Sequence, residues 1–60
     1  MTKRESALEW IRVEVAKHGE ITTLALRKYI ENRVSYDAFK DAARRGMAIF
    51  EANKKKGAGQ

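Results

Sequence analysis

Apolar residues recur at helical spacing in three segments of the chain, and two short breaks separate these segments. This periodicity predicts an all-α fold, because a half-buried strand needs apolar residues at every second position. The expected helices are 3–18, 23–32 and 36–53, which together form a single helical domain over residues 1–53. The 60 residues include no proline and no cysteine, so neither a rigid turn nor a disulfide defines the shape of the chain.

Each expected helix begins after a residue that commonly caps a helix. Thr2 and Glu5 have the spacing of a capping box at the start of the first helix. Thr22 precedes the second helix and Ser35 precedes the third. Gly19 follows the first helix and can adopt the left-handed conformation that ends it. Local chemistry therefore supports the same boundaries as the periodicity.

One apolar face on each helix supplies the candidate core. The inner positions are expected to be Ala7, Leu8, Ile11 and Val15 in the first helix, Ala25, Leu26, Tyr29 and Ile30 in the second, and Ala38, Phe39, Ala42, Ala43, Gly46, Ile49 and Phe50 in the third. Gly46 in mid-helix costs about 1 kcal/mol relative to alanine. We therefore expect a close approach of another helix at Gly46.

The formal net charge of +5 indicates a polyanionic partner, most often nucleic acid. Three lysines near the C-terminus contribute much of it, and without them the excess is +2 (5 − 3 = 2). We expect residues 54–60 to form a flexible basic tail, because like charges repel and Gly57 and Gly59 loosen the chain. The tail either contacts DNA phosphates or serves only solubility.

A short break, Asn32-Arg33-Val34, joins the second helix to the third, which has a basic outer face. This pattern is typical of a helix-turn-helix, whose second helix enters the major groove and contacts base edges with its N-terminal residues. The candidate base contacts are Ser35, Tyr36, Lys40 and Arg44. The alternative is an ordinary solvated face, and Asp41 favours it by partly neutralising Lys40 and Arg44.

Candidate phosphate contacts flank the third helix. Thr22 and Thr23 carry hydroxyls beside the free backbone amides of the second helix, where a phosphate can bind. The other candidates are basic: Arg27, Lys28, Arg33, Lys54, Lys55 and Lys56. Such contacts position a protein on DNA without reading its sequence.

From Leu24 to Gly46 the sequence resembles the helix-turn-helix regulators common among phages, plasmids and bacteria. The resemblance is carried by an apolar turn residue, a serine that opens the next helix and an inward phenylalanine: Val34, Ser35 and Phe39. It implies a small transcriptional regulator that binds duplex DNA as a homodimer at a palindromic operator. Arg33 and Tyr29 depart from the pattern, which more often has glycine and alanine there, and they allow a looser angle between the helices.

The alternative function is that of a small helical adaptor or inhibitor acting through Trp10, Val13 and Met47, because aromatic residues and methionine are typical of protein interfaces. Trp10 is equally suited to the core. An enzyme is not expected, since there is no cysteine nucleophile and both serines resemble helix-start residues. His18 has no further ligands at metal-binding spacing, so we expect no metal, no cofactor and no small-molecule substrate.

The chain contains no apolar run long enough to span a bilayer. Its polar start, Met1 to Ser6, is not followed by the hydrophobic segment of a signal peptide. We therefore expect a cytoplasmic protein without membrane contact.

Overall fold

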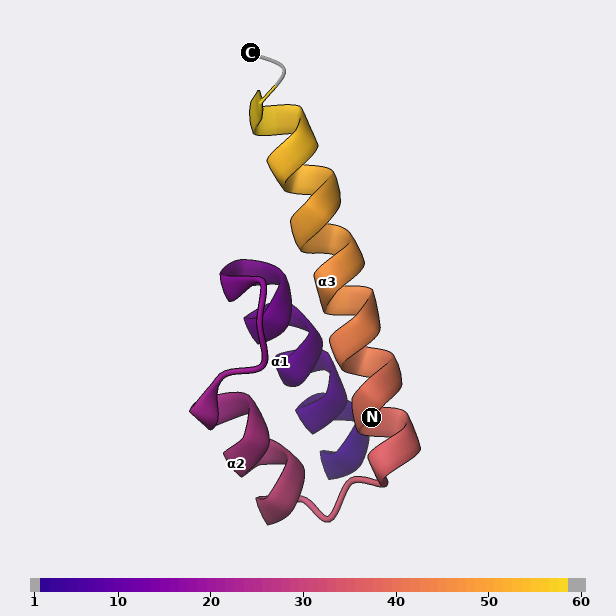
Figure 1. The fold of residues 1–60 in the computed structure, drawn as a ribbon. Helices are drawn as coiled ribbons and strands as arrows, with labels where there is room; N and C mark the ends of the chain where they lie inside the picture. Colours follow the sequence, from indigo (N-terminus) through magenta and orange to yellow (C-terminus); the bar gives the residue numbers. More distant parts are fainter. Residues whose placement is uncertain (1, 59–60) are drawn as a thin grey trace.

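The computed structural model describes the backbone of residues 2–58 and the side chains of residues 2–55. Helix α1 spans Lys3–His18, α2 spans Thr23–Glu31 and α3 spans Tyr36–Ala58 (Figure 1). The described residues contain no strand, which confirms the all-α prediction. None of the helices in this part of the chain is long and apolar enough to cross a membrane.

The three predicted N-caps are confirmed. The backbone N–H of Glu5 donates to Thr2 Oγ1 at 3.1 Å, that of Ala25 to Thr22 Oγ1 at 3.2 Å, and that of Ala38 to Ser35 Oγ at 3.2 Å. Gly19 ends α1 in the left-handed conformation, with φ at 72°. These local bonds satisfy backbone groups that a helix end leaves free, and so they define where each helix starts.

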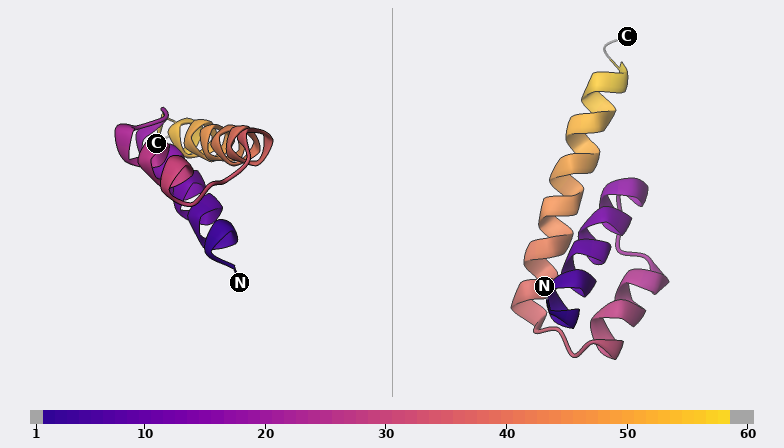
Figure 2. Two further views of the ribbon diagram at one scale, coloured as in Figure 1. Left: turned by 90° about the horizontal axis from the view of Figure 1, so that it is seen from below. Right: turned by 180° about the vertical axis from the view of Figure 1, so that it is seen from behind.

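Helices α1 and α3 make the main packing contact of the fold. Both run in the same direction, and α2, which connects them in the sequence, runs in the opposite direction beside α1 (Figures 1 and 2). Helix α2 packs mainly on α1 and has little contact with α3. The buried apolar side chains of the core are Ala7, Ile11, Val15, Ala25, Val34, Phe39, Ala42 and Ala43.

Gly46 lies at a close approach of α3 to α1. A Cβ atom at this position would lie 2.6 Å from the carbonyl oxygen of Arg12 and 2.7 Å from Val15 Cβ. Real Cβ atoms do not come so near other atoms without displacing them. The close approach predicted from the mid-helix glycine is therefore confirmed.

The predicted inner face of α2 is wrong for two residues. Leu26 is 43% exposed and Ile30 is 69% exposed, whereas Ala25 is fully buried and Tyr29 is half-buried. The physical reason is that α2 packs on essentially one neighbour, α1. One neighbouring helix covers only a narrow stripe, so the apolar residues on either side of that stripe remain exposed.

Helix α3 ends later than the sequence predicts. The expected end is near Asn53, but the helix continues to Ala58. Lysine is a good helix former, which favours continuation even without packing. The last turns project beyond α1 and α2 (Figures 1 and 2). The flexibility expected for residues 54–60 stays a prediction, and Gly59 and Gln60 lie outside the described residues.

Candidate nucleic-acid interface

The turn between α2 and α3 determines the orientation of α3 relative to α2. The N–H of Arg33 donates to the carbonyl of Ile30 at 3.3 Å, and the N–H of Val34 donates to that of Tyr29 at 3.2 Å. This pair of bonds is a Schellman motif. Arg33 has φ at 51°, so it occupies the left-handed position where glycine is common. Val34 is 6% exposed and anchors the turn to the core.

Phe39 and Tyr29 connect α3 to α2. Their rings stack with centroids 4.4 Å apart and an angle of 26° between the planes. Phe39 is buried, as the sequence predicts. Because Phe39 points inward, residues roughly half a helical turn away from it point outward. The aromatic pair therefore sets which side of α3 faces solvent.

Three of the predicted base contacts, Tyr36, Lys40 and Arg44, form an exposed row that flanks the buried face of α3. At about 100° per residue they lie about 60°, 100° and 140° around the helix from Phe39. Tyr36 is 61% exposed, and Lys40 and Arg44 are exposed. Lys40 Nζ lies 5.4 Å from the centre of the Tyr36 ring, which holds the two side chains together. Ser35 Oγ accepts the Ala38 N–H, so this serine caps the helix and has only its own hydroxyl proton left to donate.

Asp41, which was expected to neutralise Lys40 and Arg44 in part, forms an ion pair with neither of them. Its carboxylate pairs with Arg45, whose Nε lies 3.0 Å from Asp41 Oδ2. The ion pairs found among the described residues include neither Lys40 nor Arg44. Both cations are therefore free of carboxylate partners within that part of the chain.

The start of α2 is a less favourable phosphate site than the sequence suggests. The Thr22 hydroxyl lies 3.5 Å from Glu14 Oε1, and the same carboxylate oxygen lies 3.1 Å from His18 Nε2. Glu14 already supplies the negative charge that the positive end of a helix favours, and it repels a second anion. No sequence pattern indicates that the Glu14 side chain reaches the start of α2.

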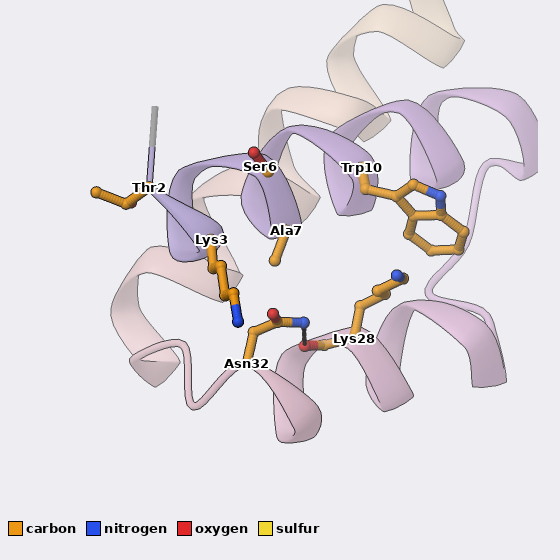
Figure 3. Close-up of a pocket in the computed structure, with 7 residues that line it drawn as sticks. All are labelled: Thr2, Lys3, Ser6, Ala7, Trp10, Lys28 and Asn32. Atoms are coloured by element: carbon orange, nitrogen blue, oxygen red, sulfur yellow. Dashed lines mark hydrogen bonds between the residues drawn. The ribbon is translucent and has the colours of Figure 1, made fainter.

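Lys28 faces away from α3. Its Nζ lies 5.4 Å from the centre of the Trp10 ring, and it lines a hollow between α1 and α2 (Figure 3). No residue of α3 lines this hollow. Trp10 is half-buried and packs against the core from outside it, while one side of the ring still reaches the hollow. Lys28 thus belongs to a different surface from Tyr36, Lys40 and Arg44.

The remaining basic candidates are dispersed. Arg33 is exposed in the turn directly before α3, whereas Arg27 is exposed on the outer side of α2. Lys54 and Lys55 are exposed on the last turns of α3. Lys54 lies 14 residues beyond Lys40, which is about 21 Å along a helix. The side chain of Lys56 lies outside the described residues.

The sequence interpretation missed an exposed apolar surface on α2. Leu26 and Ile30 lie there beside Thr23, Arg27 and Glu31, around a shallow hollow of about 250 Å³. Leu24 is also 51% exposed. A signal was present, because apolar residues at 24, 26 and 30 cover a wider arc than a nine-residue helix with one neighbour can bury.

The surface residues of the adaptor alternative are exposed but belong to different helices. Val13, on α1, is 51% exposed, and Met47, on α3, is 40% exposed.

No protein-family model matches the chain, and the curated proteins and the solved structures contain no match either. The function is therefore argued from the residues and their arrangement.

Proposed function

We propose that the chain binds duplex DNA through the outer side of the first three turns of α3, as a small transcriptional regulator of the helix-turn-helix kind. The observation that supports this most is the exposed row of Tyr36, Lys40 and Arg44, spaced four residues apart, whose cations form none of the ion pairs among the described residues. Phe39 and Val34 are buried and anchor the start of α3 in the core, which holds the row in place. Fixed donors on one helix face suit recognition of base edges in a groove.

Each side chain of the row has a distinct task in this proposal. Lys40 and Arg44 donate to guanine O6 and N7, the acceptors that these cations read in the major groove. Tyr36 contacts a thymine methyl group or donates its hydroxyl to a phosphate. Arg33, exposed just before the helix, contacts the nearest backbone phosphate. Lys54 and Lys55 add phosphate contacts only where the DNA extends along α3.

The decisive measurement is fluorescence anisotropy of a labelled random duplex at two salt concentrations. The unmodified protein should bind at low salt and weaken steeply as salt rises. The Lys40→Ala/Arg44→Ala variant should bind at least about tenfold more weakly, because it loses two donors to base edges. Circular dichroism should show the same helix content for both proteins.

A control with the same loss of charge separates the α3 face from overall charge. Arg12→Ala/Lys17→Ala also removes two cations, but both lie on α1. It should retain affinity within about threefold, since it changes only the long-range attraction of DNA. Equal losses in the two double variants would refute the α3 face. Absence of binding at low salt would refute DNA binding itself.

A homodimer is the second part of the proposal, and we assign the exposed side of α2 to it. Leu26 and Ile30 are flanked there by Arg27 and Glu31. When two copies pair across a two-fold axis perpendicular to α2, this helix runs antiparallel to its counterpart. Leu26 then meets the partner's Ile30, and Arg27 faces the partner's Glu31. This patch is self-complementary in shape and charge, as a two-fold interface requires.

The size of the chain favours such pairing and limits its strength. A chain of 60 residues buries only about 60% of its unfolded surface, so a second copy adds substantially to its core. Two nine-residue helices bury less than the roughly 800 Å² per partner of a standard interface. We therefore expect a weak dimer that depends on concentration. Thr23 and Arg27 lie in this interface and are then not available to phosphate.

Sedimentation equilibrium over a range of protein concentrations tests the dimer. Ile30→Glu should abolish association, whereas Val13→Glu, at a similarly exposed site on α1, should leave it unchanged. Arg27→Glu should weaken the dimer, and the exchange Arg27→Glu/Glu31→Arg should restore it. A protein that is monomeric at every concentration would refute the dimer and leave the α2 surface to a different protein.

A further inference from the structure

A basic hollow lies between the start of α1 and the end of α2, with a volume of about 320 Å³. Lys3 extends toward it from α1 and Lys28 from α2 (Figure 3). Trp10 forms one wall, and Asn32 lies between the two lysines along the opposite wall. No residue that lines the hollow is acidic.

Two cations line this hollow, one on each side of Asn32, and none of the lining residues supplies a counter-charge (Figure 3). The ion pairs of the described residues involve Arg12, His18 and Arg45, and neither Lys3 nor Lys28 takes part in them. Lys28 is held in place by the face of the Trp10 ring, 5.4 Å from its Nζ. Like charges brought together repel, and an anion placed between them turns this repulsion into attraction.

Neutral donors complete the walls. The oxygen of the Thr2 hydroxyl accepts the Glu5 N–H, so its own proton remains to be donated. Asn32 Nδ2 donates one hydrogen bond to the carbonyl oxygen of Lys28 at 2.9 Å and has a second N–H left. Ser6 also lines the hollow, but its hydroxyl points away from the two lysines (Figure 3). Several donors around two ammonium groups match an anion that has several acceptor oxygens.

We propose that this hollow binds a phosphate group, with Lys3 and Lys28 as its charged ligands and Thr2 and Asn32 as neutral donors. The phosphate belongs either to the backbone of a nucleic acid or to a small phosphorylated molecule. The site shares no residue with the α3 row and stands independently of the proposal that α3 binds DNA.

Trp10 is the only tryptophan of the chain, so its fluorescence reports on the hollow directly. Titration with inorganic phosphate, at ionic strength held constant with sodium chloride, should give a saturable change in the emission. Lys3→Ala/Lys28→Ala should weaken binding at least about fivefold, because two exposed charge contacts are lost. Arg12→Ala/Lys17→Ala, which removes two cations outside the hollow, should respond like the unmodified protein.

A second readout is needed because Lys28 itself contacts the indole ring. Backbone amide shifts of Ser6 and Asn32 in ¹⁵N–¹H NMR spectra should follow the same saturation curve. A change that never saturates, or one that is equal in Lys3→Ala/Lys28→Ala, would overturn the phosphate site. This result leaves the α3 proposal intact, since that proposal is tested by Lys40→Ala/Arg44→Ala.

The source of the phosphate follows from the same variants measured with duplex DNA. When the DNA backbone supplies it, Lys3→Ala/Lys28→Ala lowers the slope of log affinity against log salt by about 1–2. When DNA binding is unchanged in this variant but inorganic phosphate still binds the unmodified protein, the ligand is a small phosphorylated molecule. Both results support the site and differ only in what occupies it.

Discussion

Replacement of Gly46 by alanine has two opposing effects on the free energy of unfolding, a gain in helix propensity and a clash with α1. In an exposed mid-helix position the change stabilises by about 1 kcal/mol, because alanine favours the helix more than glycine does. In this fold the new methyl group would lie 2.6 Å from the carbonyl oxygen of Arg12 and 2.7 Å from Val15 Cβ. Neither atom can rotate away, since one belongs to the backbone and the other is bonded directly to it.

The contact cost exceeds the gain in helix propensity. Helix α1 must shift away from α3 by several tenths of an ångström, and inserting a methylene into a packed interior costs about 1–3 kcal/mol. Because the shift affects the main contact of the fold, we place Gly46→Ala at the upper end of this range. Subtracting the propensity gain leaves a net destabilisation of about 1–2 kcal/mol. A domain of this length has about 3–9 kcal/mol in total.

Thermal unfolding followed by circular dichroism at 222 nm measures the effect. The melting temperature should fall by about 4–16 °C, at 4–8 °C for each kcal/mol in a domain of this size. Ala48→Gly, at an exposed position of α3, reports the propensity alone and should cost about 1 kcal/mol. A higher melting temperature for Gly46→Ala would show that α1 and α3 are not in close contact there, and would refute the reasoning.

Three further changes test other parts of the fold and of the interface. Arg33→Gly should raise the melting temperature by a few degrees, because glycine relieves the strain of a left-handed backbone, worth about 0.5–1 kcal/mol. Arg33→Ala should not raise the melting temperature. Equal melting temperatures for the two variants would mean that the turn is unstrained. Phe39→Ala should lower the free energy of unfolding by about 3–5 kcal/mol in a urea melt, which is close to the whole stability, because the residue is buried and stacked on Tyr29. A decrease below about 1 kcal/mol would place Phe39 at the surface. Deletion of residues 54–60 should lower the salt slope of DNA binding by about 1–3, and an unchanged slope would assign these lysines to solubility alone.

The features that the sequence predicts correctly are those decided within a few residues. The start of α1 follows from Thr2 and its end from Gly19, because capping depends on atoms three or four residues away. Gly46 is predictable for a related reason. Glycine weakens a helix, so a glycine in mid-helix indicates that another helix packs closely there. The sequence therefore predicts the contact at Gly46 but does not predict that Arg12 and Val15 make it.

The errors concern features that depend on the number and direction of neighbours. Leu26 and Ile30 have the spacing of an inner face, but only the packed arrangement shows that α2 has one main neighbour. Lys40, Arg44 and Arg45 all lie within four residues of Asp41, and the side-chain rotamers decide that Arg45 is its ion-pair partner. Lys28 stands on a helix of the predicted interface, yet its direction depends on the position of Trp10 in α1.

The projecting end of α3 has a practical consequence for attaching probes and affinity tags. Among the residues whose side chains are described, Phe50 is the last that is partly buried, and from it to Ala58 the helix extends by about 12 Å away from the body of the protein. A label joined to the C-terminus is thus held clear of Tyr36, Lys40 and the α2 surface. A tag at the other terminus is joined next to Thr2 and Lys3, at the rim of the hollow between α1 and α2. Immobilisation and fluorescent labelling for the binding experiments should therefore use the C-terminus.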